Sequence, residues 1–330
     1  MDLETLIQTG SDYQLFRNLI KGRKTVIVSD DNIFKLYPEA FQGFDYILLP
    51  QGELNKNISG IEFLIEEFTR LNIDRKSLII GFGGGLITDI IGFAASVFMR
   101  GVSFGFIPTT LLAQVDAALG GKNGINYRNY KNYIGTFNQP EFIICDSRFF
   151  ETLPDIEFKS GLGEVFKYSL ITPKEGLFNY LNKNIDNILK RNSKQLNYIV
   201  KECVETKTAI VEQDPFDHNI RNILNLGHSF GHCIELINNI PHGIAVVAGI
   251  NIATDFSVKL DLLKPEIKIG INELANKLGF EEKVNFTQDH LEILLKDKKK
   301  ENNLIKLILL NDIGHPKTVK FDRDQITVLL

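Results

Sequence analysis

The stretch that decides the fold is LIIGFGGGLITD, residues 78–89. A short apolar run, typical of a strand buried on both faces, leads into glycines at 83, 84 and 85, and a helical pattern follows them. Glycines at such a turn let the backbone approach a ligand, and amides at the helix start favour a phosphate. The alternative is a tight structural turn that needs positive φ. Because Leu86 stands where the GxGxxG motif has its third glycine, the turn alone does not decide between the two.

The region around this turn, residues 78–99, is also apolar enough to raise the question of a membrane span. Its glycines and the central Asp89 favour a strand, a turn and a helix instead. The first residues, MDLETLIQTG, lack the pattern of a signal peptide. We therefore expect a soluble, cytoplasmic protein with no membrane partner.

Outward from the turn, the first half of the chain alternates strand and helix patterns. Helical spacing links Ile61, Leu64, Phe68 and Leu71. The expected strands are residues 25–28, 46–49, 78–81, 103–107 and 142–145, and nearly all of their residues are apolar. Such alternation predicts a largely parallel sheet of βαβ units.

The second half of the chain changes character at about residue 156. Residues 175–191, 196–213 and 244–263 carry long helical patterns, and a short strand pair is possible at 304–310 and 318–321. We expect an α/β Rossmann-like domain at 1–155, followed by a mainly α-helical domain at 156–330. Ligand sites favour the cleft between two such domains and the carboxyl ends of parallel strands.

The overall composition excludes several classes of protein. The 330 residues are 44% hydrophobic and 24% charged, with a net charge of −4, which argues against a nucleic-acid binder. The three cysteines, Cys145, Cys203 and Cys233, are scattered and without CxxC spacing. They predict neither a disulfide framework nor a thiolate zinc site, and each is most simply a small buried side chain.

Polar residues follow three other expected strands and strengthen the case for a nucleotide. SDDN at 29–32, GELNK at 52–56 and PTT at 108–110 all fall where an open α/β sheet holds a nucleotide. An acidic residue after a strand could bind a ribose hydroxyl.

Three of the six histidines, His228, His232 and His242, lie within fifteen residues and suggest a metal site. A hydrogen-bonded core role is the alternative for any one of them. Spacing alone would make His228 and His232 both ligands, because they share a helix face at i and i+4. The pair is not the HExxH motif of zinc proteases, since Ser229 takes the place of the glutamate.

A carboxylate from elsewhere in the chain would complete such a site. Glu164, in GLGEVFKY, lies among apolar residues of a helical pattern, with Lys167 on the same face at i+3. The alternative for this pair is an exposed salt bridge. Spacing does not single out Glu164 from the other acidic residues.

Seven segments together closely resemble the 3-dehydroquinate synthase family and occur in the family's order. They are GGGLITD, MRGVSFGFIPTTLLAQVDAALGGK, KNYIGTFNQP, FETLP, GLGEVFKY, RNILNLGHSFGHCIE and HGIAVVAG. The resemblance covers residues from about 24 to about 315. It implies a Rossmann-like NAD domain, a helical metal domain, and an active site between them. The implied reaction converts 3-deoxy-D-arabino-heptulosonate 7-phosphate to 3-dehydroquinate and phosphate, the second step of the shikimate pathway.

The resemblance also implies cofactors and site residues. NAD would be used catalytically and regenerated, and the divalent metal, Zn²⁺ or Co²⁺, would be held by Glu164, His228 and His242. His232 would then face the substrate phosphate. The implied NAD residues are Asp30, Asn32, Glu53, Lys56, Gly84, Gly85, Asp89, Thr109, Thr110, Lys122, Lys131, Phe149 and Thr152. The implied substrate residues are Asp116, Lys122, Asn132, Lys167, Lys207, Arg221, Asn225 and His232, joined by Lys298 or Lys299. Arg100 would reach into the neighbouring subunit's site, which implies a homodimer.

The chain departs from the family pattern at several positions. Ile244 stands where the family usually has a glutamate after the last ligand histidine, Thr88 and Tyr130 replace glycines, and Asn123 replaces a threonine. These changes leave every implied ligand in place and put the surroundings of the metal in question.

Three alternatives remain open at this point. The first is another sugar-phosphate cyclase, such as a 2-deoxy-scyllo-inosose or 2-epi-5-epi-valiolone synthase. The second is a metal-dependent polyol or alcohol dehydrogenase, and the third is a catalytically silent metal protein. The retained Leu224, Asn225 and His232, with the lysines of DKK at 297–299, favour the dehydroquinate reaction.

Overall fold

The computed structural model describes residues 5–50, 52–128, 130–172, 176–280, 284–297 and 304–330. The chain divides into two compact units, Met1–Leu153 (unit 1) and Pro154–Leu330 (unit 2). Unit 1 is built on a sheet and unit 2 mainly on helices, which confirms the predicted α/β domain followed by a helical one.

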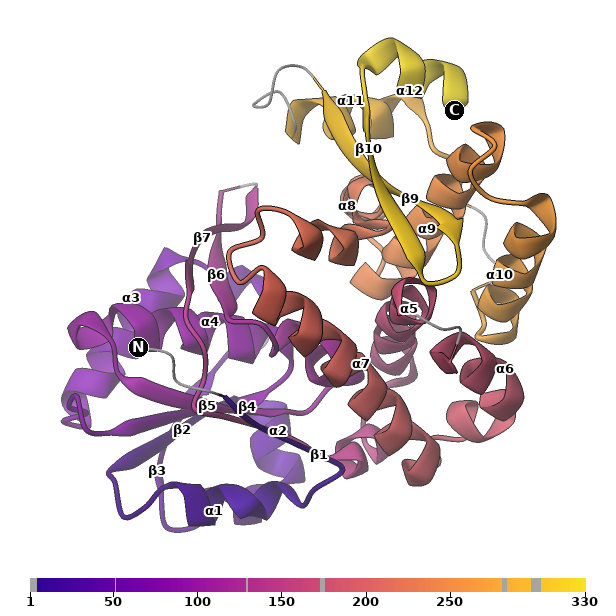
Figure 1. Cartoon of the computed structure of the whole chain (residues 1–330). Coiled ribbons are helices and arrows are strands. Elements are labelled where there is room, and N and C mark those ends of the chain that lie inside the picture. Colours follow the sequence, from indigo (N-terminus) through magenta and orange to yellow (C-terminus); the bar gives the residue numbers. More distant parts are fainter. Residues whose placement is uncertain (1–4, 51, 129, 173–175, 281–283, 298–303) are drawn as a thin grey trace. The chain divides into compact units, whose positions relative to one another are not determined.

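Unit 1 contains a six-stranded parallel sheet in the order β1-β8-β5-β4-β2-β3. Its strands are β1 (Leu6–Thr9), β2 (Thr25–Asp30), β3 (Asp45–Leu49), β4 (Leu78–Gly83), β5 (Ser103–Pro108) and β8 (Phe142–Cys145). Its α-helices are α1 (Phe16–Leu19), α2 (Asp31–Leu36), α3 (Ile58–Arg70) and α4 (Gly85–Val97). Figure 1 shows α1 and α2 on one side of the sheet and α3 and α4 on the other.

Both faces of this sheet are covered at its inner strands β2, β4, β5 and β8, whose alternate residues point to opposite sides and are nearly all buried. Ile80 and Phe82 of β4 belong to a core cluster that also includes Phe16 of α1 and Ile33 of α2. On the other side, Gly81 of β4 faces α4, since a Cβ atom there would be in van der Waals contact with Ile91, 3.4 Å away. The nearly continuous apolar strands of the sequence follow from this double covering.

Two features of unit 1 were not predicted. Strand β1 has only four residues and pairs with β8, more than a hundred residues away along the chain. The hairpin of β6 (Lys122–Tyr127) and β7 (Tyr130–Phe137) is largely exposed along β7, so it lacks the apolar pattern on which strand prediction depends.

Unit 2 is made of eight α-helices among its described residues, with one antiparallel strand pair. The helices are α5 (Asp155–Ile171), α6 (Gly176–Leu189), α7 (Ser193–Gln213), α8 (His228–Asn238), α9 (His242–Lys259), α10 (Pro265–Lys277), α11 (Gln288–Asp297) and α12 (Arg323–Leu329). The strands are β9 (Ile305–Asp312) and β10 (His315–Phe321), so the predicted strand pair is present. Helix α9 packs directly on both α5 and α8.

Residues 78–99 form β4, the glycine turn and α4 rather than a membrane span. Across the described part of the chain, no helix combines the length and apolar character that crossing a membrane requires. All three cysteines are buried and unpaired with one another, as expected for small apolar side chains.

Candidate functional site

One carboxylate and two imidazoles converge in unit 2. A ligand atom from each of Glu164, His228 and His242 lies within 4.8 Å of the others. The Glu164 Oε1 atom is 3.5 Å from His228 Nε2 and 3.3 Å from His242 Nε2. Residues from three separate helices, α5, α8 and α9, therefore present their polar atoms to one small volume.

Glycines allow these three helices to approach closely enough for the side chains to meet. A Cβ atom on Gly163 of α5 would lie 2.2 Å from the carbonyl oxygen of Gly243 in α9. A Cβ atom on Gly243 would lie 1.7 Å from the Ser160 oxygen, and one on Gly249 would lie 2.0 Å from the Gly227 oxygen. Every glycine in this set is in contact with backbone of a neighbouring segment, so any side chain there would push the helices apart.

Lys167 lies beside the carboxylate of Glu164, one helical turn further along α5. The Lys167 Nζ atom is 2.5 Å from Glu164 Oε2, and the two side chains are 1% and 0% exposed. The alternative of an exposed salt bridge is therefore wrong. Charges buried this deeply are expensive to leave uncompensated, so the pair indicates a built polar site rather than a solvated helix face.

The two imidazoles differ in their proton affinity. Burial, the largest effect, lowers the pKa of His228 to about 3 despite the attraction of Glu164. Burial also disfavours protonation of His242, but hydrogen bonds with Glu164 and Glu235 outweigh it and raise the pKa of His242 to about 9. In both residues the Nδ1 atom has its own partner, the Leu226 carbonyl at 3.2 Å and the Glu235 carboxylate at 3.0 Å.

This arrangement fits a divalent cation such as zinc. Two imidazole nitrogens and one carboxylate oxygen are the ligand set of many catalytic zinc sites, which keep a position open for water or substrate. Because the Nδ1 atoms are engaged elsewhere, the Nε2 atoms of His228 and His242 both face Glu164. His232 is exposed and is not in the group of three, although its ring centroid lies 5.4 Å from that of His228.

Two further cations are buried in unit 2. Lys207, on α7, is 6% exposed and Arg221 is 2% exposed. Arg221 follows a loop organised by Asp214, whose carboxylate accepts hydrogen bonds from the backbone amides of His218, Asn219 and Arg221 at 2.9, 2.6 and 3.1 Å. Burial opposes the charge, but these three bonds together keep the pKa of Asp214 below its usual value. Asn225 ends the same segment and is exposed.

In unit 1, the candidate NAD residues lie at the carboxyl ends of the parallel strands. Asp30 is the last residue of β2, Glu53 follows β3, Gly84 and Gly85 follow β4, and Thr109 and Thr110 follow β5. Parallel strands end at one edge of their sheet, so these residues share that edge. The carboxylate of Asp30 also caps α2, accepting hydrogen bonds from the amides of Asn32 and Ile33.

The glycines of the 83–85 turn are required by packing and not by positive φ. Gly84 has φ −74°, and none of these glycines has a positive φ, so that part of the expectation was wrong. A Cβ atom on Gly83 would lie 2.6 Å from Ile87, and one on Gly84 would lie 3.0 Å from Thr110. The turn therefore holds the start of α4 close to the end of β5.

An ion pair links two of the candidate NAD residues beside this turn. Lys56 Nζ is 2.6 Å from Asp89 Oδ2, and the two side chains are 6% and 17% exposed. Asp89 lies on α4, within the helix that the glycine turn begins.

Sequence reasoning missed Asn126, which contacts three of the candidate residues. Its side-chain amide donates to Glu53 at 2.8 Å, its side-chain oxygen accepts from the Asn132 backbone amide at 2.9 Å, and its own amide donates to the Lys56 carbonyl at 2.8 Å. The β6–β7 hairpin is thereby fixed to the segment that follows β3. The GIN triplet at 124–126 gave no signal by itself, because its partners are distant in sequence.

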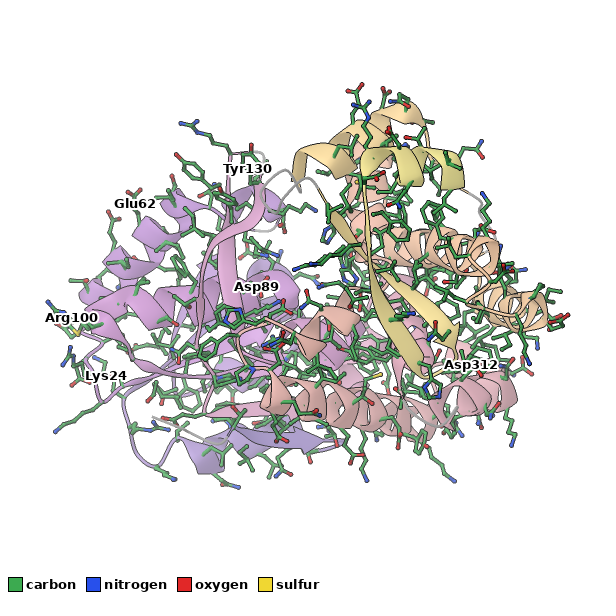
Figure 2. All side chains as sticks on the ribbon, turned by 45° about the horizontal axis from the view of Figure 1, so that its top comes forward. Lys24, Glu62, Asp89, Arg100, Tyr130 and Asp312 are labelled. Carbon is green, nitrogen blue, oxygen red and sulfur yellow. The ribbon has the colours of Figure 1, made fainter. Side chains whose placement is uncertain are left out.

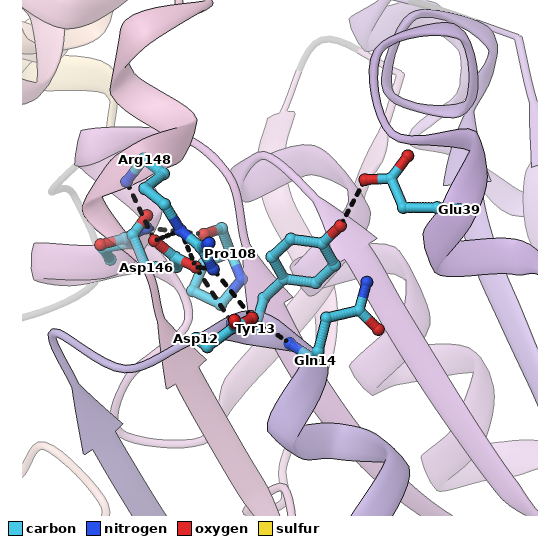
Figure 3. A network of polar contacts seen from close by, with 8 residues as sticks. Asp12, Tyr13, Gln14, Glu39, Pro108, Asp146 and Arg148 are labelled. Carbon is cyan, nitrogen blue, oxygen red and sulfur yellow. Dashed lines mark hydrogen bonds and ion pairs between the residues drawn. The ribbon is translucent and has the colours of Figure 1, made fainter.

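The segment that carries Phe149 and Thr152 begins at a polar network after β8 (Figure 3). The buried Asp146 carboxylate accepts hydrogen bonds from the Tyr13 amide at 3.0 Å and from the Arg148 guanidinium, which also pairs with Asp12 at 2.8 Å. The Tyr13 hydroxyl donates to Glu39 at 2.6 Å. Phe149 is buried, and the Thr152 hydroxyl is 2.6 Å from the hydroxyl of Tyr37.

Arg100 is not brought together with the other candidates of unit 1. It is exposed, in the left-handed region at φ 67°, and Figure 2 shows it at the periphery of unit 1, apart from Asp89. Lys122, Lys131 and Asn132 are exposed on the β6–β7 hairpin, and Asp116 is half-buried after β5. Lys298 and Lys299 lie outside the described residues.

Two of the departures from the family pattern are explained by local packing. Asn123 is buried, donates hydrogen bonds to the carbonyls of Gly121 and Asn138, and occupies the space beside Gly92 of α4. Thr88 is buried, and its hydroxyl bonds to the Gly85 carbonyl. Tyr130 is exposed and its ring lies 5.0 Å from that of Tyr133.

Comparisons with known proteins cover both units. Residues 46–160 match the family model for the 3-dehydroquinate synthase N-terminal domain, and residues 161–300 match the model for its C-terminal domain. The 3-dehydroquinate synthase of Dictyoglomus turgidum is 36% identical over 96% of this chain and 93% of its own length. The 3-dehydroquinate synthase of Campylobacter fetus is 40% identical over 86% of this chain and 82% of its own.

Among solved structures, a 2-epi-5-epi-valiolone synthase from Streptomyces hygroscopicus has a similar fold. It superimposes with a TM-score of 0.89 at 22% identity, over 100% of this chain and 96% of its own, and it holds NAD⁺ and Zn²⁺. At this identity the likeness shows the fold alone.

Proposed function

Because the chain belongs to the 3-dehydroquinate synthase family, we propose that it converts 3-deoxy-D-arabino-heptulosonate 7-phosphate to 3-dehydroquinate and phosphate, the second step of the shikimate pathway. The observation that carries the proposal is the convergence of Glu164, His228 and His242, with Lys167 paired to the same carboxylate. Such a buried group of ligands and cations suits an anionic substrate with hydroxyls to chelate.

The proposal includes NAD and a divalent metal, Zn²⁺ or Co²⁺. When bound, NAD supplies reversible hydride transfer and the metal supplies Lewis-acid polarisation of substrate hydroxyls. Glu164, His228 and His242 would hold the metal, and the set of residues at the strand ends of unit 1 would hold NAD. The Lys56–Asp89 pair and the close-packed 83–85 turn support this assignment, because they give the cofactor edge a fixed shape.

Lys207 and Arg221 would bind the substrate carboxylate. Both cations are buried, and a guanidinium presents two parallel donors to a carboxylate. Asp214 fixes the backbone that leads to Arg221, so the arginine is oriented before substrate arrives. Asn225, Asp116 and Lys167 complete the proposed contacts to the body of the sugar.

Lys122, Asn132 and His232 would bind the substrate phosphate. Each is exposed and is therefore accessible to an entering phosphate group. Their role is to hold the leaving phosphate and to stabilise its charge as the carbon–oxygen bond breaks. The phosphate itself can accept the proton that elimination releases, which removes the need for a strong base from the chain.

A homodimer in the cytoplasm is the remaining part of the proposal. Arg100 is exposed at the edge of unit 1, a position from which a side chain could contribute to a second copy. Sedimentation of wild type and of Arg100→Ala tests the oligomeric state. Mixing an inactive Glu164→Gln chain with Arg100→Ala tests whether two copies share a site. Recovery of activity on mixing supports a shared site, and its absence in a proven mixed dimer contradicts it.

The reaction is tested by incubating Co²⁺-loaded protein with the heptulosonate phosphate and NAD while phosphate and NADH are followed together. Phosphate release without net NADH is expected, because the hydride returns to the product. Net NADH without phosphate would identify a dehydrogenase, and neither signal would identify a silent protein. Mass spectrometry identifies the carbocyclic product. Assays with glucose 6-phosphate and sedoheptulose 7-phosphate as competing substrates distinguish the proposed activity from those of the other cyclases.

A further inference from the structure

Glu235 contacts one of the three candidate metal ligands but was assigned no role by sequence reasoning. It lies on α8, and its Oε2 atom is 3.0 Å from His242 Nδ1 at the start of α9. The side chains of Glu235 and His242 are 13% and 29% exposed. The contact is therefore largely shielded from water, where a charge-assisted hydrogen bond is stronger than on an open surface.

We propose that Glu235 is a positioning residue for the metal site, acting through His242. Its carboxylate accepts the hydrogen of Nδ1–H, so that Nε2, 3.3 Å from Glu164 Oε1, is the nitrogen that would give up its proton to bind a metal. A carboxylate behind an imidazole also makes that imidazole a stronger electron donor. The inference rests on the metal site of the proposed function and adds a fourth residue to it.

The two imidazoles of the site are oriented by different kinds of partner. His228 Nδ1 contacts a backbone carbonyl, that of Leu226, at 3.2 Å, while His242 Nδ1 contacts a carboxylate. Substitution of Glu235 removes the partner of His242, whereas no side-chain substitution removes the backbone carbonyl that is the partner of His228. The carboxylate that contacts His242, on α9, comes from α8.

The test uses the full chain, stripped of metal and titrated with Co²⁺, whose visible absorption reports both affinity and ligand geometry. We expect Glu235→Ala to weaken Co²⁺ binding by about 10-fold to 100-fold and to alter the absorption bands. Glu235→Gln keeps an oxygen acceptor without the charge, so its affinity should fall between those of wild type and Glu235→Ala. Circular dichroism of the metal-free variants shows whether they are folded.

Asp255→Asn is the matched control. Asp255 lies on α9, as His242 does, and pairs with Lys268 rather than with a candidate ligand, so its variant should bind Co²⁺ as the wild type does. Wild-type affinity and bands in Glu235→Ala would overturn the proposal. If Glu235→Ala does not fold, Glu235→Gln decides, and an unchanged affinity and spectrum in that variant would overturn the proposal. Because the readout is metal binding, it is separate from the reaction: Co²⁺ binding without phosphate release would contradict the proposed function alone.

Discussion

The two units hold their candidate residues in opposite ways. In unit 1 these residues lie mostly in loops at the ends of strands, and several of them, such as Asn32, Glu53 and Lys122, are exposed. In unit 2 the three candidate metal ligands and Lys167 lie on the helices α5, α8 and α9, and Glu164 and Lys167 are 0% and 1% exposed. The ends of the parallel strands position the candidate residues of unit 1, and the close packing of helices positions those of unit 2.

This difference predicts unequal tolerance to change. Replacing an exposed loop residue should remove a ligand contact but cost little stability, because water solvates the polar groups that it contacted. A buried charge cannot be removed without leaving its partner in a medium that solvates it poorly.

Replacing Glu164 should have the largest effect. Glu164→Gln removes a proposed metal ligand and leaves the Lys167 ammonium buried without that carboxylate. We expect loss of metal, loss of turnover, and a decrease in the free energy of unfolding of roughly 3 to 5 kcal/mol. Metal analysis after dialysis and urea denaturation measure these changes.

Glu67→Gln in unit 1 is the matched control. Glu67 pairs with Arg70 at the same i,i+3 spacing and at 2.6 Å, but the Arg70 side chain is 63% exposed. Its variant should keep its metal and lose far less stability. Equal losses in the two variants would remove the distinction between buried and exposed pairs.

The next effect is expected at the contact between α5 and α9. In Gly243→Ala the new methyl group would meet the Ser160 carbonyl oxygen, so the helices must separate. Overpacking of this kind costs roughly 1 to 3 kcal/mol, and Co²⁺ affinity should fall with it because Glu164 and His242 move apart. Gly270→Ala on α10 meets nothing within 4 Å and should instead stabilise the helix by roughly 0.5 to 1 kcal/mol. A Gly243→Ala protein with wild-type stability and Co²⁺ affinity would contradict the packing argument.

In unit 1, Lys56→Met should weaken NAD binding while leaving metal binding unchanged. The variant lacks the ammonium that forms an ion pair with the Asp89 carboxylate beside the glycine turn. We expect the dissociation constant for NAD to rise about tenfold, which corresponds to about 1.4 kcal/mol. Isothermal titration measures it, with Lys76→Met, at an exposed position before β4, as the control. Unchanged NAD affinity would exclude Lys56 from the cofactor site.

The smallest effect is expected from protonation of His290 in unit 2. Burial lowers the pKa of His290, whose Nε2 is 2.8 Å from Asn238 Oδ1 and whose Nδ1 accepts from Thr287. Since the folded pKa lies below that of the unfolded chain, about 6.5, the unfolded state binds more protons as the pH falls below that value. This contribution to stability is therefore complete above pH 6.5 and declines toward lower pH.

Comparison with His290→Gln isolates that contribution from those of the other histidines. The stability difference between wild type and variant, from urea denaturation at pH 8 and pH 5.5, should be smaller at pH 5.5. A difference that is constant or larger at pH 5.5 would mean that His290 is not held in its neutral form.

The sequence alone predicted the elements with strong periodicity. Buried parallel strands are uniformly apolar, so β2, β3, β4, β5 and β8 were recognisable from short runs of letters. The long helices of unit 2 were recognisable from their spacing. Strand β1 and the β6–β7 hairpin were not, because their pairing partners are distant or their faces are exposed.

For the candidate site, local spacing was an incomplete guide. It indicated a metal near the histidines, yet it favoured His228 with His232, which share a helix face, over His242 on the next helix. The segments resembling the synthase family pointed to Glu164 and His242 instead. Neither route indicated Glu235 or Asn126, whose contacts exist only in the folded chain.

The sequence was therefore sufficient to predict the strongly periodic strands and helices in their order along the chain, the glycine turn at 83–85 and the family. Hydrophobic periodicity and turn chemistry are local, so they can be recognised without knowing what lies nearby in space. Only the tertiary structure decided that Glu164 and Lys167 are buried together, that glycines bring α5, α8 and α9 into contact, and that a carboxylate stands behind His242. Burial and side-chain contact depend on which distant segments pack against one another, and no local pattern carries that information.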